Sequence, residues 1–88
     1  MLSIQQNIFA PIIPYIRTFN PGSCFISVSL NREKFEPDLH ALEKYLLNFT
    51  IKFDPAGVVH FQGNLISKEL CKFLYDQFKQ YRKQILST

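Results

Sequence analysis

The side chains that could do chemistry in this chain are few and far apart. The histidines, His40 and His60, have no cysteine or carboxylate at a spacing typical of a catalytic or metal-binding group. The cysteines, Cys24 and Cys71, have no second pair and fit neither a zinc spacing nor a disulfide framework. We therefore expect a non-enzymatic protein without metal or cofactor, in which both cysteines are buried free thiols.

The positive charge of the chain is concentrated at its C-terminal end. The 88 residues carry a net charge of +3, and the segment 68–88 supplies all of that excess, while residues 1–67 are neutral. Its basic side chains are Lys68, Lys72, Lys79, Arg82 and Lys83. We predict that these residues contact a partner by long-range attraction to an acidic protein surface or to phosphate. The alternative is that they only solubilise a helix.

A second group of candidate residues lies on the expected sheet. Phe25 falls on the polar side of its strand, beside Ser27 and Ser29. There an aromatic ring can contact a protein partner or stack on an RNA base. The remaining expected contacts to a ligand or to RNA are Arg17, Lys52 and His60.

Alternation of apolar and polar residues predicts four strands that would carry these side chains. They are expected over residues 15–19, 24–30, 49–53 and 58–62. The turn between the first two contains Pro21, which presets φ at the second position, and Gly22, which takes a positive φ at the third. The face of the second strand expected to be buried consists of Cys24, Ile26, Val28 and Leu30.

Two registers compete in the second hairpin. A two-residue loop would pair Phe53 with Val58. A three-residue loop with Gly57 as a left-handed bulge would pair Phe53 with Val59 instead. A slip of one residue exchanges the faces of a strand, and only the bulged register gathers the apolar residues on one face. That face would comprise Phe49, Ile51, Phe53, Val59 and Phe61.

Two helices follow the hairpins. The first is expected to begin with Pro37, after a polar connection over residues 31–35, and to end at Asn48. Its apolar stripe is expected to be Leu39, Leu42, Tyr45 and Leu46. The last helix has Ser67 or Asn64 as its cap. Its buried stripe is expected to be Leu70, Phe73, Leu74, Phe78, Tyr81 and Ile85.

The sequence thus predicts one α+β domain over residues 1–88, with the order β-β-α-β-β-α. An antiparallel four-stranded sheet would have both helices on one face, giving two layers. Residues 1–13 form an N-terminal arm, either helical over residues 3–9 or extended across the core. Pro11 and Pro14 exclude regular helix after that point. The apolar run 8–16 is too short to span a membrane.

Composition points to a partner. Apolar residues make up 47% and charged residues 19% of the chain, which leaves apolar surface beyond the needs of a small core. No secretory signal is recognisable, so we expect a cytoplasmic, reducing environment. The first hypothesis is a small binding module, an adaptor or subunit that docks onto a larger protein assembly. The alternative is an RNA-binding accessory factor of translation or transcription, and self-association is left open.

One likeness bears on the RNA alternative. Residues 57–64, followed by Cys71, Lys72, Phe73 and Leu74, resemble the final strand and helix of the small translation initiation factor domain that monitors start codons. The order of elements is similar as well. That family carries a basic, glycine-containing first hairpin, whereas this chain has residues 20–23 there, with only Arg17 nearby. The departure removes the residues that the resemblance would assign to RNA.

Overall fold

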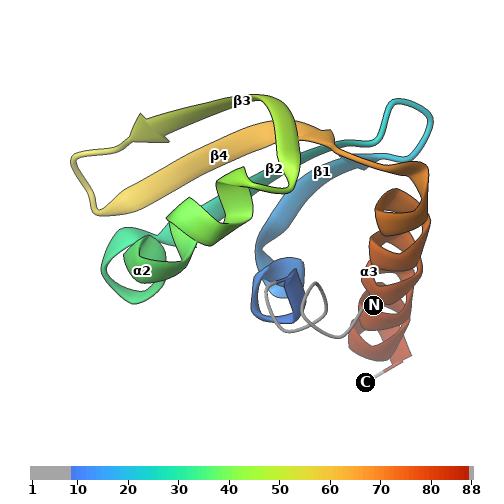
Figure 1. The fold of residues 1–88 in the computed structure, drawn as a ribbon. Coiled ribbons are helices and arrows are strands. Elements are labelled where there is room, and N and C mark those ends of the chain that lie inside the picture. Colours follow the sequence, from blue (N-terminus) through green and yellow to red (C-terminus); the bar gives the residue numbers. More distant parts are fainter. Residues whose placement is uncertain (1–8, 88) are drawn as a thin grey trace.

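The computed structural model describes residues 9–87 and forms a four-stranded antiparallel sheet in the order β1-β2-β4-β3. Its elements are η1 (Ala10–Tyr15), β1 (Ile16–Asn20), β2 (Phe25–Asn31), α2 (Arg32–Glu43), β3 (Leu46–Phe53), β4 (Val58–Leu65) and α3 (Lys68–Ser87). The helices all lie on one side of the sheet (Figure 1). The predicted α+β class and the order β-β-α-β-β-α are confirmed.

The core fills the space between the sheet and the helices. The two central strands, β2 and β4, contribute their alternate side chains to it. The most deeply buried residues are Phe9, Ile12, Ile26, Val28, Leu30, Leu42, Val59, Phe61, Leu70 and Leu74. The opposite face of the sheet has no helix over it in the part of the chain that the structure describes (Figure 1).

The segment before β1 belongs to the core. Pro11 and Pro14 do prevent an α-helix, but residues 10–15 form a short 3-10 helix, with Pro11 in its first turn, where an N–H has no partner within the helix. Phe9 and Ile12 are almost fully buried, so this part of the predicted arm packs inside the domain. The predicted helix over residues 3–9 lies, except for Phe9, outside the described residues.

The first helix starts earlier than predicted, and the polar connection over residues 31–35 is wrong. Asn31 caps α2, because its side-chain oxygen accepts a hydrogen bond of 2.9 Å from the Lys34 N–H. Phe35 anchors the first turn in the core, where its ring meets Tyr15 edge-on with centroids 5.3 Å apart. These contacts offset the cost of Pro37, which lies inside the helix.

The helix also ends earlier than predicted, because Leu46 already belongs to β3. Leu46 pairs with Leu65 and is buried from the strand. Asn48 does not stop the helix. It adopts a left-handed φ of 53° within β3, at the point where the register with β4 shifts between Leu47 and Thr50. Asparagine tolerates this conformation better than most residues, which suits it to a bulge.

The second hairpin has the bulged register. Phe53 pairs with Val59 and Ile51 with Phe61, as predicted. The Gly57 N–H donates to the Asp54 carbonyl at 2.9 Å, and the Asp54 N–H donates to the Val58 carbonyl at 2.8 Å. Gly57 has a φ of 89°. These bonds and the left-handed Gly57 match the predicted three-residue loop with a glycine bulge.

In the first hairpin, the residue with a positive φ is not the one that was predicted. The prediction of a positive φ at Gly22 is wrong, and Cys24 takes the left-handed conformation with a φ of 55°. The side-chain oxygen of Asn20 accepts a 3.0 Å hydrogen bond from the Gly22 N–H, which holds the turn without it. Strand β2 consequently begins at Phe25, and Cys24 is half-buried beside the core.

The last helix agrees with its prediction except at Phe73, which is only half-buried, and at its C-terminal end. Ser67 is the cap, since its hydroxyl accepts a 3.1 Å hydrogen bond from the Leu70 N–H. Leu70 and Leu74 are fully buried, while Phe78 and Tyr81 pack partly against the core. Ile85 is 51% exposed, so its prediction as a buried residue is wrong.

Candidate binding surfaces

The uncovered face of the sheet is polar with a few apolar side chains. Antiparallel pairing places Phe25 between Asn20 and Asn64 on adjacent strands. Phe25 is half-buried there, on central strand β2, as the sequence predicted for the polar side. Further along, Ser29 pairs with His60, which pairs with Lys52. These side chains form a row across three strands.

His60 in that row contacts two residues that are distant from each other in the sequence, Ser29 and Asp54. The Ser29 hydroxyl lies 3.0 Å from His60 Nδ1, within hydrogen-bond distance. On the other side of the ring, His60 Nε2 lies 3.7 Å from Asp54 Oδ2. That second distance is longer than a hydrogen bond, and both side chains are exposed to water. The cluster suits recognition of a polar ligand better than activation of Ser29 as a nucleophile, which needs a held and shielded base.

The predicted ligand contacts do not form one site. Lys52 and His60 are exposed neighbours on β3 and β4. Arg17 is exposed on β1, at the other edge of the sheet, where the register shifts between Ile16 and Thr18. Asp54 and Ser29, which complete the cluster around His60, were not predicted. Only the pairing of β2 with β4 reveals them, and that pairing is not readable from local patterns.

The basic residues of α3 lie on its outer surface. All five are exposed: Lys68, Lys72, Lys79, Arg82 and Lys83. Two of them lie over aromatic rings, with Lys79 Nζ 5.1 Å from the Tyr75 centroid and Arg82 Cζ 5.6 Å from that of Phe78. Lys79 Nζ also lies 3.9 Å from Asp76 Oδ1. These contacts order part of the basic surface, and its binding role stays a prediction.

Strand β3 is an edge strand with exposed apolar side chains. It pairs with β4 on one side, and no described strand pairs with the other. Leu47 is 54%, Phe49 38% and Phe53 53% exposed. The apolar face expected for this hairpin is buried at Val59 and Phe61 on β4 and partly buried at Ile51 on β3, whereas Phe49 and Phe53 are exposed.

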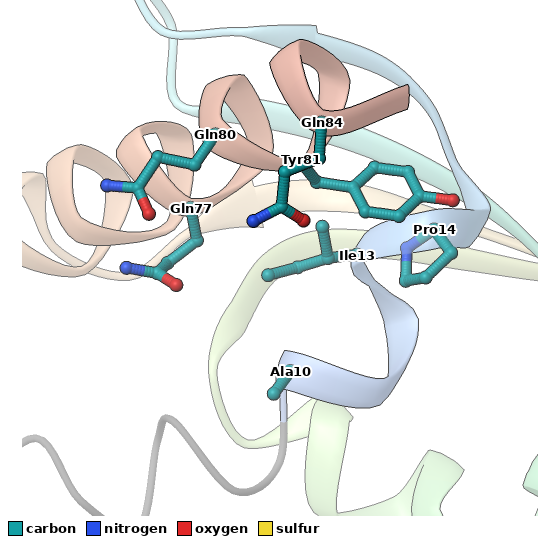
Figure 2. Close-up of a pocket in the computed structure, with 7 residues that line it drawn as sticks. All are labelled: Ala10, Ile13, Pro14, Gln77, Gln80, Tyr81 and Gln84. Atoms are coloured by element: carbon teal, nitrogen blue, oxygen red, sulfur yellow. The ribbon is translucent and has the colours of Figure 1, made fainter. Parts of the chain in front are cut away.

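Two hollows lie beside α3. One, of about 220 Å³, separates η1 from the C-terminal half of the helix, and Figure 2 shows Ala10, Ile13 and Pro14 facing Gln77, Gln80, Tyr81 and Gln84 across it. The other, of about 440 Å³, lies between the β1–β2 turn and the first turns of α3. It is the more apolar of the two and contains both cysteines of the chain.

Comparisons with family models, with curated proteins and with solved structures found no match. The likeness to the initiation factor domain therefore rests on residues 57–64 and 71–74 alone. Over residues 9–87, no helix combines the length and apolar character needed to cross a membrane. In the same part of the chain, no three His, Cys, Asp or Glu side chains gather in a way that could hold a metal ion.

Proposed function

We propose that this protein is a non-enzymatic binding module that docks onto a protein partner through the free edge of β3. The observation that carries the proposal is the combination of an unpaired strand edge with three exposed apolar side chains, Leu47, Phe49 and Phe53. An exposed edge of this kind accepts an extended segment of another chain as an additional strand.

The backbone of β3 supports the same mode of docking. Asp54 exchanges hydrogen bonds with Gly57 and Val58 at the hairpin tip. From there along the ladder, pairs that exchange no hydrogen bonds alternate with pairs that exchange two. Phe53 opposite Val59 and Ile51 opposite Phe61 are then the pairs that exchange no hydrogen bonds. The N–H and C=O groups of Ile51 and Phe53 consequently point away from β4, toward the position of an added strand.

Arg32 restricts the position of the Phe53 ring at this edge. The guanidinium of Arg32, at the start of α2, lies 4.6 Å from its centroid. Arg32 is fixed in turn by the bond from its backbone N–H to the Gly57 carbonyl, at 2.9 Å, and its side chain lies 3.7 Å from Glu36 Oε1. A stacked cation limits the freedom of the ring, which lowers the entropic cost of binding.

Two substitutions at one position separate the backbone contribution from that of the side chain. Phe53→Thr removes the ring and keeps the outward N–H, while Phe53→Pro removes both. Proline is tolerated on the open side of an edge strand, so both variants should stay folded. Proteins captured from the native source by the nuclease-treated wild-type chain would be purified and titrated against the three forms.

The proposal expects weaker binding with Phe53→Thr and loss of binding with Phe53→Pro, with unchanged circular dichroism. Equal affinity of all three forms for the purified partner would contradict it. A second copy of the chain is a possible occupant of the same edge. Light scattering tests this directly, because such a dimer would dissociate in the Phe53→Pro variant.

The open face of the sheet favours RNA as a second candidate ligand. Phe25 on β2 and the pair of Lys52 and His60 offer an aromatic ring and cationic or polar groups on one uncovered surface. Single-stranded RNA is bound by stacking bases on such rings. The basic surface of α3 would add phosphate contacts.

Salt dependence distinguishes the two candidates. Changing Lys72, Lys79 and Lys83 together to Gln should leave folding nearly intact, because exposed charges contribute little to stability. If RNA is the ligand, affinity should fall, and the slope of log affinity against log salt should flatten by about 0.7–0.9 for each lost phosphate contact. If a protein strand docks on β3, the same variant should bind it almost as well as the parent at moderate salt.

A further inference from the structure

The hollow of about 440 Å³ beside α3 brings the two cysteines together from distant parts of the sequence. Cys24 enters it from the end of the β1–β2 turn, and Cys71 from the first turns of α3. Lys68, Lys72 and Asp76 line the same hollow. The two cysteines come together only because α3 packs beside the β1–β2 turn. Their spacing in the sequence does not indicate a pair.

The two thiols differ in accessibility. Cys71 is only 4% exposed, and its Sγ donates a weak hydrogen bond to the Pro21 carbonyl at 3.8 Å. Burial, together with the neighbouring Cys24 thiol, raises the pKa of Cys71 to about 12. Cys24 is half-buried and held by its carbonyl, which accepts a 2.8 Å hydrogen bond from the Leu65 N–H. A reagent entering the hollow therefore meets Cys24 first.

We propose that Cys24 and Cys71 are a redox site that forms a reversible internal disulfide by exchange with a small anionic disulfide of the glutathione type. The bond would connect the β1–β2 turn to α3. The proposal is independent of docking on β3, since the site uses other elements. The proposal replaces the expectation that both cysteines are buried, unreactive thiols with a pair of thiols that react with each other.

The exchange has two steps. The Cys24 thiol loses its proton and attacks one sulfur of glutathione disulfide, whose S–S bond breaks; one glutathione leaves and takes up a proton. Cys71 then loses its proton and attacks the Cys24 sulfur, which breaks the mixed disulfide and releases the second glutathione. Two protein thiols are oxidised by two electrons, and one glutathione disulfide is reduced to two glutathione thiols. The fold supplies the proximity that the second step needs.

The charge of the hollow selects the oxidant. Lys68 and Lys72 contribute two positive charges against the single carboxylate of Asp76, and Asp76 is already close to Lys79. Glutathione disulfide carries a net negative charge, so it should accumulate near the hollow relative to a neutral disulfide. The lysines therefore act on the encounter, not on the exchange chemistry.

The test is oxidation of the full chain by mixtures of reduced and oxidised glutathione, followed by acid quenching and mass spectrometry. The wild type should lose two hydrogen atoms and give one peptide pair linked through Cys24 and Cys71. Cys71→Ser should stop with one glutathione bound to Cys24. Cys24→Ser should react about tenfold more slowly, because its remaining thiol is buried. Accumulation of mixed disulfide without the internal link, or no reaction of the wild type, would overturn the proposal.

Two controls sharpen the result. In denaturant the internal link should no longer be favoured over the mixed disulfide; equal yields in folded and unfolded chain would show that the fold builds no site. The double variant Lys68→Gln and Lys72→Gln should slow the reaction with glutathione disulfide several-fold while leaving that with neutral hydroxyethyl disulfide unchanged. The matched variant Arg82→Gln and Lys83→Gln, further along α3 and outside the hollow, should change neither rate. Equal effects of the two double variants would contradict charge selection at the hollow.

Discussion

Gly63 on β4 lies directly against Phe49 on β3: a Cβ added to Gly63 would stand 3.0 Å from the Cβ of Phe49. It would also stand 3.1 Å from the backbone carbonyl oxygen of Leu47. This close approach occurs where the β3–β4 register shifts, and it lets the Phe49 ring stack on Phe61 with centroids 5.7 Å apart and planes 2° from parallel. Gly63 is therefore a packing residue within β4, although the strand was expected to end at residue 62.

Gly63→Ala should destabilise the protein by about 1–3 kcal/mol, the usual cost of an overpacked site. The contacts are with backbone and Cβ atoms, so no flexible side chain can move aside to relieve them. Urea unfolding monitored by circular dichroism measures the loss. The control is Gly22→Ala, whose new Cβ would meet only the side-chain oxygen of Asn20 at 3.2 Å. A Gly63→Ala protein as stable as this control would contradict the packing argument.

Gly57→Ala should cost about 1 kcal/mol or more for a conformational reason. The φ of Gly57 is 89°, and an added Cβ would meet nothing within 4 Å, so the penalty cannot come from a clash. Gly57→Asn should lose less stability, because asparagine tolerates left-handed conformations better than alanine. Thermal unfolding of the three proteins checks the order. Equal stability of the alanine and glycine forms would mean that the bulge does not require a positive φ.

Leu74→Ala should destabilise the domain by about 2–5 kcal/mol. Leu74 has no exposed surface and lies in the core. In a domain of this size such a loss approaches the whole free energy of unfolding, so the variant should unfold at low urea or fail to fold. Ile85→Ala on the same helix is the comparison, since Ile85 is 51% exposed and its truncation should change little. A large effect at Ile85 would show that the C-terminal part of α3 is covered.

The stability of the protein should fall as the pH rises above 9. Burial raises the pKa of Cys71 from 9.0 to about 12 in the folded protein. Below pH 9 the thiol is protonated in both states, whereas between pH 9 and 12 the unfolded chain loses the proton that the folded protein keeps. Unfolding is then favoured by up to about 1.4 kcal/mol per pH unit.

The slope is compared with that of Cys71→Ala, which lacks the thiol. The variant should lose stability less steeply with pH than the parent, whatever its absolute stability at pH 7. Urea unfolding in reducing buffer at several pH values gives both slopes. Parallel slopes would mean that Cys71 does not contribute to the pH dependence.

Much of the fold was predictable because the strands alternate in period two and their turns contain informative residues. Ile26, Val28 and Leu30 alternate with serines, and the placement of Phe53, Gly57 and Val59 left one register that gathers the apolar residues. The start of α2 was missed because Pro37 is a stronger local signal than the cap at Asn31. Local preference was outweighed there by the burial of Phe35.

The candidate sites were less predictable because they form across strands that are distant in sequence. Ser29 meets His60 only through the pairing of β2 with β4, and Cys24 meets Cys71 only when α3 packs beside the first turn. The exposure of Phe53 was also hidden, since the pattern of β3 shows which side is apolar but not which of its side chains the rest of the fold covers. The basic residues of α3 were predictable, because helical spacing alone places them outward.

The β2–β4 ladder also determines how the chain must assemble. Its partners are separated least in sequence at Asn31 and Val58, and the separation increases steadily toward Phe25 and Asn64. The pair with the smallest separation, Asn31 and Val58, lies next to the hydrogen bond from the Arg32 N–H to the Gly57 carbonyl. Each hairpin closes through local contacts, whereas the ladder between them must close a loop that contains α2 and β3, and the shortest such loop ends at that bond. Pairing of β2 with β4 should therefore start at Asn31 and Val58 and proceed toward Phe25 and Asn64. Lengthening the α2–β3 connection would then slow folding while leaving the folded structure unchanged.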